Sequence, residues 1–140
     1  MASPTKFFLF LFSFAVVHSA DADSLDQWNV RTSGIGLNFY AITYGAGRFV
    51  AVGPPQTIIT STNGEVWNAG TNIAATFLNG VAWGNNTFVA VGNEGTILTS
   101  PDAVTWTQES SPTTNHLRCV RFVNGGFIAL GYNGTLLAST

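Results

Sequence analysis

Residues 44–61 of the chain read YGAGRFVAVGPPQTIITS, and the pattern returns at residues 83–100 as WGNNTFVAVGNEGTILTS and at residues 122–139 as FVNGGFIALGYNGTLLAS. The three segments align without a gap, and the interval from the first to the second equals that from the second to the third. A fixed period of this length is typical of proteins built from repeated supersecondary units. The positions that recur at this spacing are Trp28, Trp67 and Trp106; Phe49, Phe88 and Phe127; Gly53, Gly92 and Gly131; and Ser61, Ser100 and Ser139.

Each repeat predicts four short strands separated by tight turns. In the first repeat we expect strands at residues 40–45, 49–53 and 57–61, with a fourth strand carrying Trp67. Short runs of β-branched and aromatic residues between Gly, Asn and Asp turns are typical of β-hairpins, and no segment shows helical periodicity. The second and third strands are apolar on both faces, so each sheet needs a neighbour on either side. We therefore expect an all-β fold of β-propeller type with three four-stranded blades, one to each thirty-nine-residue repeat.

The turn after the third strand resembles the Asp-box, also called the bacterial neuraminidase repeat, in a form one residue shorter. Residues 61–64 read STNG ahead of Trp67, and residues 100–103 read SPDA ahead of Trp106. The phrase FVAVG-x-x-G-T-I-L-T-S that precedes the box is similar to the repeat of the photosystem II assembly-factor propellers. The resemblance covers about residues 24–140. It implies a propeller whose box turns lie on the face away from any ligand.

The box residues have a structural role in this interpretation. The Asn or Asp side chain bonds backbone amides of the turn, and the glycine takes the positive-φ position. The tryptophan wedges between blades and buries roughly 200 Å². Ala103 departs from the pattern, because it stands where the turn glycine is expected. The repeat-signature residues are Trp28, Ser61, Asn63, Gly64, Trp67, Ser100, Asp102, Trp106 and Ser139.

Three blades are fewer than the four to eight of closed propellers, so two apolar sheet faces need a cover. If each face hides on the order of 500 Å², its exposure costs roughly 12 kcal/mol. After removal of an N-terminal signal, we expect the mature chain to open on an outer-strand piece at residues 27–29 and to close on a third strand at residues 135–139. We consider two resolutions. The chain dimerises into a six-bladed ring in which each N-terminal strand completes the partner's last blade, or further repeats of a longer propeller are missing.

Residues 1–22 carry the pattern of a secretory signal. Lys6 precedes an apolar run at residues 7–17, and the small residues Ala20 and Ala22 follow it. The run is too short to span a bilayer, which needs about 20 apolar residues. We expect a signal peptide at residues 1–22, a repeat domain at residues 23–140, and an exported protein without a membrane anchor. The alternative is a buried N-terminal strand or helix.

Composition excludes several function classes. The net charge is −2 and Lys6 is the only lysine, whereas a nucleic-acid surface needs clustered Lys and Arg. His116 and Cys119 stand alone in the predicted domain, so no metal site or other cofactor is predicted. Cys119 is expected to be a small buried apolar residue.

The resemblance to sialidase repeats raises the question of catalysis. A sialidase site would need three arginines from several blades, together with a tyrosine nucleophile and acidic partners. Arg118 and Arg121 instead lie in one predicted innermost strand. We therefore expect a non-catalytic module that binds a ligand or assembles with a protein. The alternatives are a segment or remnant of a sialidase-like glycoside hydrolase, and a structural fragment of a larger exported repeat protein.

The candidate ligand-binding residues lie in turns that differ between repeats while the strands do not, or, for Tyr40, Arg118 and Arg121, on predicted innermost strands from which they could reach the mouth of the channel. Variable turns on a constant scaffold are where specificity is usually placed. Tyrosine, arginine and amide side chains suit a glycan or an extended peptide. Asn85 and Asn133 also begin N-glycosylation sequons. The candidate ligand-binding residues are Tyr40, Asn93, Glu94, Arg118, Arg121, Tyr132 and Asn133.

Overall fold

The computed structural model describes residues 28–55, 57–70 and 76–139. They belong to two compact units, one ending at Val30 and the other running from Arg31 to Thr140. The predicted signal peptide, residues 1–22, lies outside the described residues. Trp28, where the sequence predicts a piece of an outer strand, is in no strand and is 91% exposed.

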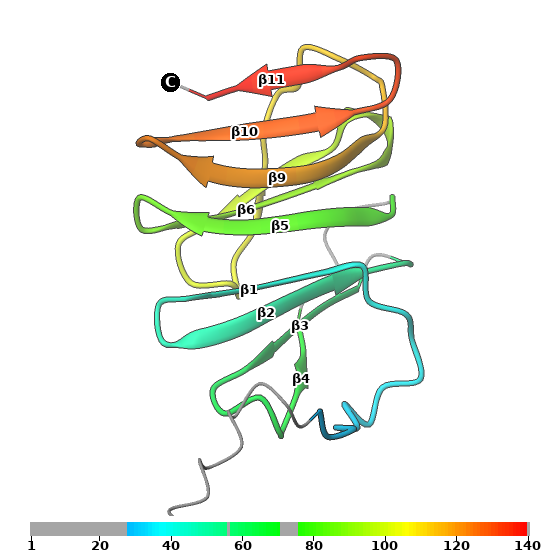
Figure 1. The fold of residues 1–140 in the computed structure, drawn as a ribbon, viewed down its shortest axis with the longest axis vertical. Coiled ribbons are helices and arrows are strands. Elements are labelled where there is room, and N and C mark those ends of the chain that lie inside the picture. The colour runs from blue at the N-terminus through cyan, green and yellow to red at the C-terminus, as the bar shows by residue number, and fades with distance from the viewer. Residues whose placement is uncertain (1–27, 56, 71–75, 140) are drawn as a thin grey trace, which may run out of the picture. The chain divides into compact units, whose positions relative to one another are not determined.

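All strands of the described residues lie in the second unit and form three antiparallel sheets (Figure 1). The first sheet, blade 1, is β1 (Ala41–Gly45), β2 (Arg48–Gly53), β3 (Thr57–Ser61) and β4 (Asn68–Ala69). Blade 2 is β5 (Leu78–Gly84), β6 (Thr87–Gly92), β7 (Ile97–Ser100) and β8 (Thr107–Gln108), with the short 3-10 turn η1 (Asn93–Gly95) between β6 and β7. Blade 3 is β9 (Leu117–Val123), β10 (Gly126–Gly131) and β11 (Leu136–Ala138).

The predicted all-β architecture is confirmed, and the three sheets fit a partial β-propeller. Strand order within each blade follows the chain order, as in an up-and-down meander. The fourth strands differ from the prediction, because they begin just after Trp67 and Trp106 rather than at them. The physical reason is the turn before each tryptophan, in which the backbone N–H of the preceding residue, Val66 or Thr105, bonds to the Asn63 or Asp102 side chain and is not free to pair with the third strand. The described residues contain no helix long and apolar enough to cross a membrane.

The first strands of the blades form the inner row of the unit. Figure 1 shows β1, β5 and β9 side by side, and contacts join β1 to β5 and β5 to β9. Two aromatic rings fix this row at one end. Trp83 of β5 lies against Gly45 of β1, and Phe122 of β9 lies against Gly84 of β5, so closely that a Cβ on either glycine would overlap the ring. The third repeat lacks this seat, because Val123 stands where Gly45 and Gly84 stand in the other two.

Two cores hold the blades together. In each, the second and third strands of one blade pack against the next blade, as the two-sided apolar pattern predicts. The core between blades 1 and 2 contains Val50, Val52, Ile58, Leu78, Val81, Phe88, Ala90, Leu98, Ala103 and Trp106. The core between blades 2 and 3 contains Ala82, Val89, Val91, Leu117, Val120 and Ala129.

The β3–β4 turn is built around the side chains of Ser61 and Asn63. The Ser61 hydroxyl accepts the N–H of Asn63 at 3.3 Å and that of Gly64 at 2.9 Å. Asn63 Oδ1 accepts the N–H groups of Glu65 and Val66, both at 3.0 Å. Gly64 has φ +74°, as a positive-φ turn position requires.

The β7–β8 turn repeats this network with a carboxylate. Ser100 Oγ accepts the N–H of Ala103 at 2.8 Å, and Asp102 Oδ1 accepts the N–H groups of Val104 and Thr105, both at 2.8 Å. Ala103 adopts φ +60° in place of the expected glycine. In blade 3 the equivalent serine acts differently, since Ser139 Oγ accepts the N–H of Phe127 at 2.8 Å.

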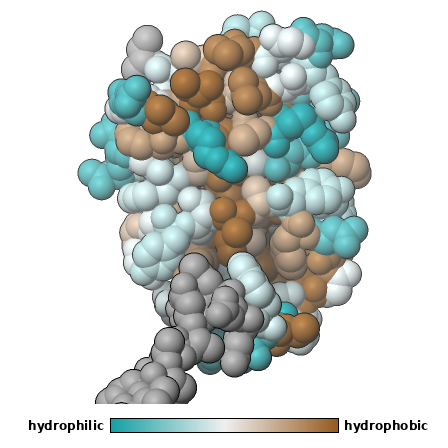
Figure 2. Space-filling model, viewed as in Figure 1, coloured by the Kyte–Doolittle hydropathy of each residue, from teal (hydrophilic) through white to brown (hydrophobic). Residues whose placement is uncertain are grey.

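The outer faces of blades 1 and 3 carry exposed apolar side chains within the described residues. On blade 1 these include Ile42 and Tyr44, and Trp67 is only half-buried whereas Trp106 is 6% exposed. On blade 3 they include Ile128, Leu130 and Leu136, and Figure 2 shows hydrophobic side chains gathered over this blade at the top of the view.

Candidate functional site

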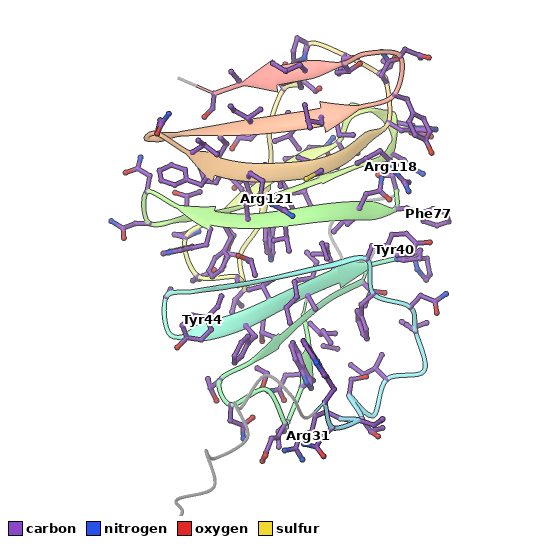
Figure 3. All side chains as sticks on the ribbon, viewed as in Figure 1. Arg31, Tyr40, Tyr44, Phe77, Arg118 and Arg121 are labelled. Atoms are coloured by element: carbon purple, nitrogen blue, oxygen red, sulfur yellow. The ribbon has the colours of Figure 1, made fainter. Side chains whose placement is uncertain are left out.

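The candidate site lies at the end of the blades where the inner strands begin. Each blade is a meander, so the start of its first strand and the turn between its second and third strands lie at one end, and the turn after its third strand lies at the other. Figure 3 shows Tyr40, Phe77 and Arg118 at this end, just before or within β1, β5 and β9. All three side chains are exposed. We call this region the inner-strand end.

Arg118 is the centre of the hydrogen-bonded network at this end. Its guanidinium Nη1 donates to Asn79 Oδ1 at 3.4 Å, and its Cζ lies 5.4 Å from the centroid of the Tyr132 ring. The buried Asn79 side chain in turn donates to the carbonyl of Leu117 at 2.8 Å and to Asn93 Oδ1 at 2.9 Å. Residues from the starts of β5 and β9 and from the turns after β6 and β10 are thereby joined.

Arg118 projects to the surface because β9 is irregular at this point. The pairing of β9 with β10 shifts between Leu130 and Gly131, so that Leu117 pairs with Gly131 and Cys119 with Leu130. Arg118 is the extra residue, and a bulge of this kind redirects a side chain out of the regular alternation. Leu117 and Val120 on either side remain buried against blade 2.

A second group of contacts orders the turn after β10. The Tyr132 and His116 rings lie 5.9 Å apart, and His116 Nδ1 accepts the backbone N–H of Glu94 at 2.9 Å. Asn133 donates from Nδ2 to Asn115 Oδ1 at 3.2 Å. The predicted residues Asn93, Glu94, Tyr132 and Asn133 therefore lie around Arg118 at this end of the blades.

Two predicted residues stand apart from that network. Arg121 is exposed in the middle of β9, where its Nη1 donates to the carbonyl of its neighbour Val120 at 2.9 Å. Tyr40 lies at the inner-strand end, immediately before β1 in the sequence, and its backbone N–H donates to Val52 O at 2.8 Å. Figure 3 also places Arg31 far from Arg118 and Arg121, so these three arginines do not converge on one ligand group.

Three residues of the inner-strand end are not among the ligand-binding candidates that the sequence suggested. Asn79 occupies the same repeat position as Tyr40 and Arg118, and this equivalence alone could have identified it. Phe77 and His116 share a repeat position with Asn38, and three different residue types at one position are the signal that was available. His116 carries a ring contact and a hydrogen bond that its isolation in the sequence does not suggest.

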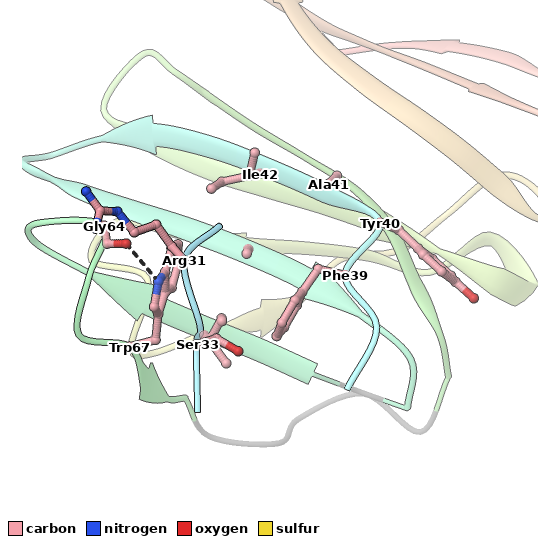
Figure 4. A pocket seen from close by; sticks show the side chains of 10 residues that line it. Arg31, Ser33, Phe39, Tyr40, Ala41, Ile42, Gly64 and Trp67 are labelled. Atoms are coloured by element: carbon pink, nitrogen blue, oxygen red, sulfur yellow. Dashed lines mark hydrogen bonds between the residues drawn. The ribbon is translucent and has the colours of Figure 1, made fainter. Parts of the chain in front are cut away.

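A hollow of about 390 Å³ lies elsewhere, on the uncovered face of blade 1. Its lining includes Arg31, Phe39 and Trp67, and Figure 4 shows the Trp67 indole donating to the carbonyl of Gly64. None of the predicted ligand-binding residues except Tyr40 borders it. No group of three His, Cys, Asp or Glu side chains that could hold a metal ion is found among the described residues.

The remaining polar sites lie in turns. Asn85 is exposed in the β5–β6 turn, and Asn133 is exposed in the turn between β10 and β11, so both sequons are accessible in this structure. Asp102 belongs to the β7–β8 turn, at the opposite end from Arg118. The N–H groups of Thr105 and then Val104 hold the pKa of the Asp102 carboxyl below its ordinary value.

The sequence matches no family model, and a search of curated proteins finds no significant match. Solved structures that share the fold include two propellers. One is YCF48 bound to D1 peptide, with a TM-score of 0.64 and 18% identity over 74% of this chain and 38% of that chain. The other is the WD40 β-propeller domain of Doa1, with a TM-score of 0.58 and 13% identity over 75% of this chain and 38% of that chain. The chain therefore spans well under half the length of either, and the likeness confirms a propeller-type fold.

Proposed function

We propose that the chain is an exported, non-catalytic propeller module that binds an extended peptide at its inner-strand end. The observation that carries the proposal is the exposed Arg118 guanidinium, held between Asn79 and the face of Tyr132. Within the described part of the chain, no carboxylate forms an ion pair with Arg118. Its charge therefore remains available to a ligand, while its position is fixed.

The chemistry of this end suits a peptide main chain flanked by apolar side chains. A guanidinium presents several N–H donors to carbonyl or carboxylate oxygens. Tyr40, Phe77 and Tyr132 are all about half-exposed, and exposed aromatic rings supply contact area for apolar side chains at little entropic cost. A glycan would use the same donors and rings, but the structure offers no specific observation that favours it.

The comparison with YCF48 supports the same ligand class, because that propeller was solved with a peptide bound. Similarity at 18% identity shows fold and leaves the ligand of this chain to be tested. The signal-like pattern at residues 1–22 supports export.

The test is fluorescence anisotropy of the purified chain with a panel of fluorescein-labelled nonapeptides, each with one aromatic residue. Half carry a free C-terminal carboxylate and half carry an amide. We expect a subset to bind, and Arg118→Ala to weaken that binding by about tenfold or more, as for a desolvated arginine anchor.

Arg121→Ala is the matched control, because it removes an exposed arginine from the same strand outside the network. It should change peptide affinity by less than about twofold. Equal losses in both variants would contradict the proposal, and so would a failure of every peptide to bind. Binding of an oligosaccharide panel, lost in Arg118→Ala without any peptide binding, would favour the glycan instead.

A further inference from the structure

In the described part of the chain, blades 2 and 3 leave a groove between them. It measures about 600 Å³ and is lined by Val89, Ile97 and Thr99 of blade 2 and by Phe127, Ala129 and Leu137 of blade 3. Most of these side chains are apolar, and several are half-exposed. The groove runs beside β11, the last strand of blade 3.

The corresponding space between blades 1 and 2 is filled by Trp106. The Trp106 indole packs in the core with Val50 and Ile58 of blade 1, and its ring lies 6.5 Å from that of Phe88. One repeat further along the chain, the positions of Val50, Ile58 and Phe88 are taken by Val89, Ile97 and Phe127, which line the groove. The groove is therefore equivalent in the repeat to the space that Trp106 fills between blades 1 and 2, but no tryptophan of the described residues fills it.

The edge of β11 is also incomplete. In blade 1, Thr60 pairs with Asn68 and Ile59 with Ala69, and in blade 2 Thr99 pairs with Thr107. The backbone of blade 1 then continues with Gly70 N–H donating to Ile58 O at 2.7 Å. Among the described residues no fourth strand pairs with β11.

We propose that residues 28–31 of a second copy of the chain add to β11 as the missing fourth strand. Trp28 stands one repeat before Trp67, so the residues after Trp28 occupy the repeat positions that form the fourth strand after Trp67. The repeat then dictates the register. Asn29 pairs with Ala138 and Val30 with Leu137, the Arg31 N–H donates to Leu136 O, and the Trp28 indole fills the groove beside Phe127.

The start of blade 1 explains why the acceptor is a second copy. Figure 4 shows Arg31 beside Gly64 and Trp67, on the uncovered face of blade 1 where a preceding blade would stand. A strand that leads into Arg31 would therefore complete a blade packed on that face. Blade 3 of another copy is such a blade. The segment is available for this contact, since Trp28 and Val30 are 91% and 94% exposed.

The contact is head-to-tail and depends mainly on the outer strand. Its two surfaces differ, so it closes into a ring if the rotation allows and otherwise continues as a filament. At the inner row, Val123 replaces the glycine that seats Trp83 and Phe122 at the other junctions. Tyr44 of the next copy would meet that valine, and the strand and the Trp28 indole must supply most of the attraction.

The test is sedimentation velocity of the purified protein, expressed with its N-terminal segment intact so that the cell performs any processing. We expect concentration-dependent self-association. Trp28→Ala should weaken it by at least about tenfold, as expected for a buried aromatic anchor. Ala138→Pro should weaken it similarly, because proline removes an N–H that faces the free edge while leaving the β10–β11 ladder intact. Val66→Ala, an exposed apolar residue of the β3–β4 turn, is the control and should associate normally.

Mixing separates strand exchange from misfolding. The Trp28→Ala chain keeps an intact acceptor and the Ala138→Pro chain keeps an intact strand, so a mixture of the two should associate more strongly than either variant alone. A protein that stays monomeric at all concentrations would overturn the proposal. So would self-association that Trp28→Ala leaves unchanged, which would point to the exposed faces or to further repeats as the contact.

Discussion

At the residue scale, the β3–β4 and β7–β8 turns show how one side chain can fix a whole turn. Asn63 in blade 1 and Asp102 in blade 2 each accept two N–H groups at equivalent positions of their turns, and a serine in each turn accepts two more. The sequence predicted this network, because Asx side chains bond the backbone just ahead of them. It did not predict that Ala103 would adopt a positive φ, as Gly64 does. Ala103 is fully buried in the core between blades 1 and 2, and that packing offsets the strain.

Asn63 and Asp102 occupy equivalent turn positions, but only Asp102 can be protonated, and this difference gives a prediction of how stability depends on pH. The pKa of Asp102 is lowered in the folded chain, first by the Thr105 N–H and then by the Val104 N–H. The contribution of this group to stability is therefore complete above its unfolded pKa, about 3.9, and is lost as the pH falls through the folded value. Urea unfolding midpoints measured from about pH 6 down to about pH 3 should therefore fall on acidification.

Asp102→Asn should keep the turn, since Asn63 serves the same role in blade 1, and should flatten this acid dependence. An unchanged acid slope in the variant would show that Asp102 is not its source.

At the element scale, the same residue type acquires different burial according to the neighbour that its blade receives. Trp67 and Trp106 occupy one repeat position, yet Trp106 is 6% exposed and Trp67 is only half-buried. Blade 1 covers the Trp106 face of blade 2, whereas no blade of the described structure covers the Trp67 face of blade 1. The sequence could predict the position of each indole but not its burial.

This difference predicts unequal effects of two matched substitutions. Trp106→Ala should lower the free energy of unfolding by about 3–5 kcal/mol, the usual cost of emptying a large buried aromatic site. Trp67→Ala should cost less than half as much in the monomer. Chemical denaturation of both variants at low protein concentration measures the two effects. Equal losses would contradict the blade assignment.

The strands and the site differ in how far sequence could predict them. The repeat period placed each of the first three strands to within about one residue, because turn glycines and apolar runs recur in register. The hydrogen bond from Arg118 to Asn79 joins blade 3 to blade 2, and it depends on β5 and β9 lying side by side, which the repeat pattern alone does not specify. The stacking of Arg118 on Tyr132 depends on a bulge in β9 that no residue type in the sequence announces.

At the scale of the whole molecule, three stacked blades share two cores and leave apolar side chains on the outer faces of blades 1 and 3. Both cores follow from the two-sided apolar strands, so the sequence predicted that blades would stand side by side. Among the described residues, β11 has no paired fourth strand and Trp28 is exposed. Above all, each inner strand packs against the next through a glycine of one repeat and an aromatic ring of the following repeat.

Proton NMR of the two seat glycines tests that claim most directly. Trp83 and Phe122 lie against Gly45 and Gly84, so the Hα signals of both glycines should be shifted by ring currents and show NOEs to the rings. Gly47, which has no atom within 4 Å of an added Cβ, is the control and should show neither effect. Trp83→Ala should remove the shift of Gly45 and leave that of Gly84. Ordinary Hα shifts at both glycines, with no NOE to either ring, would contradict the account.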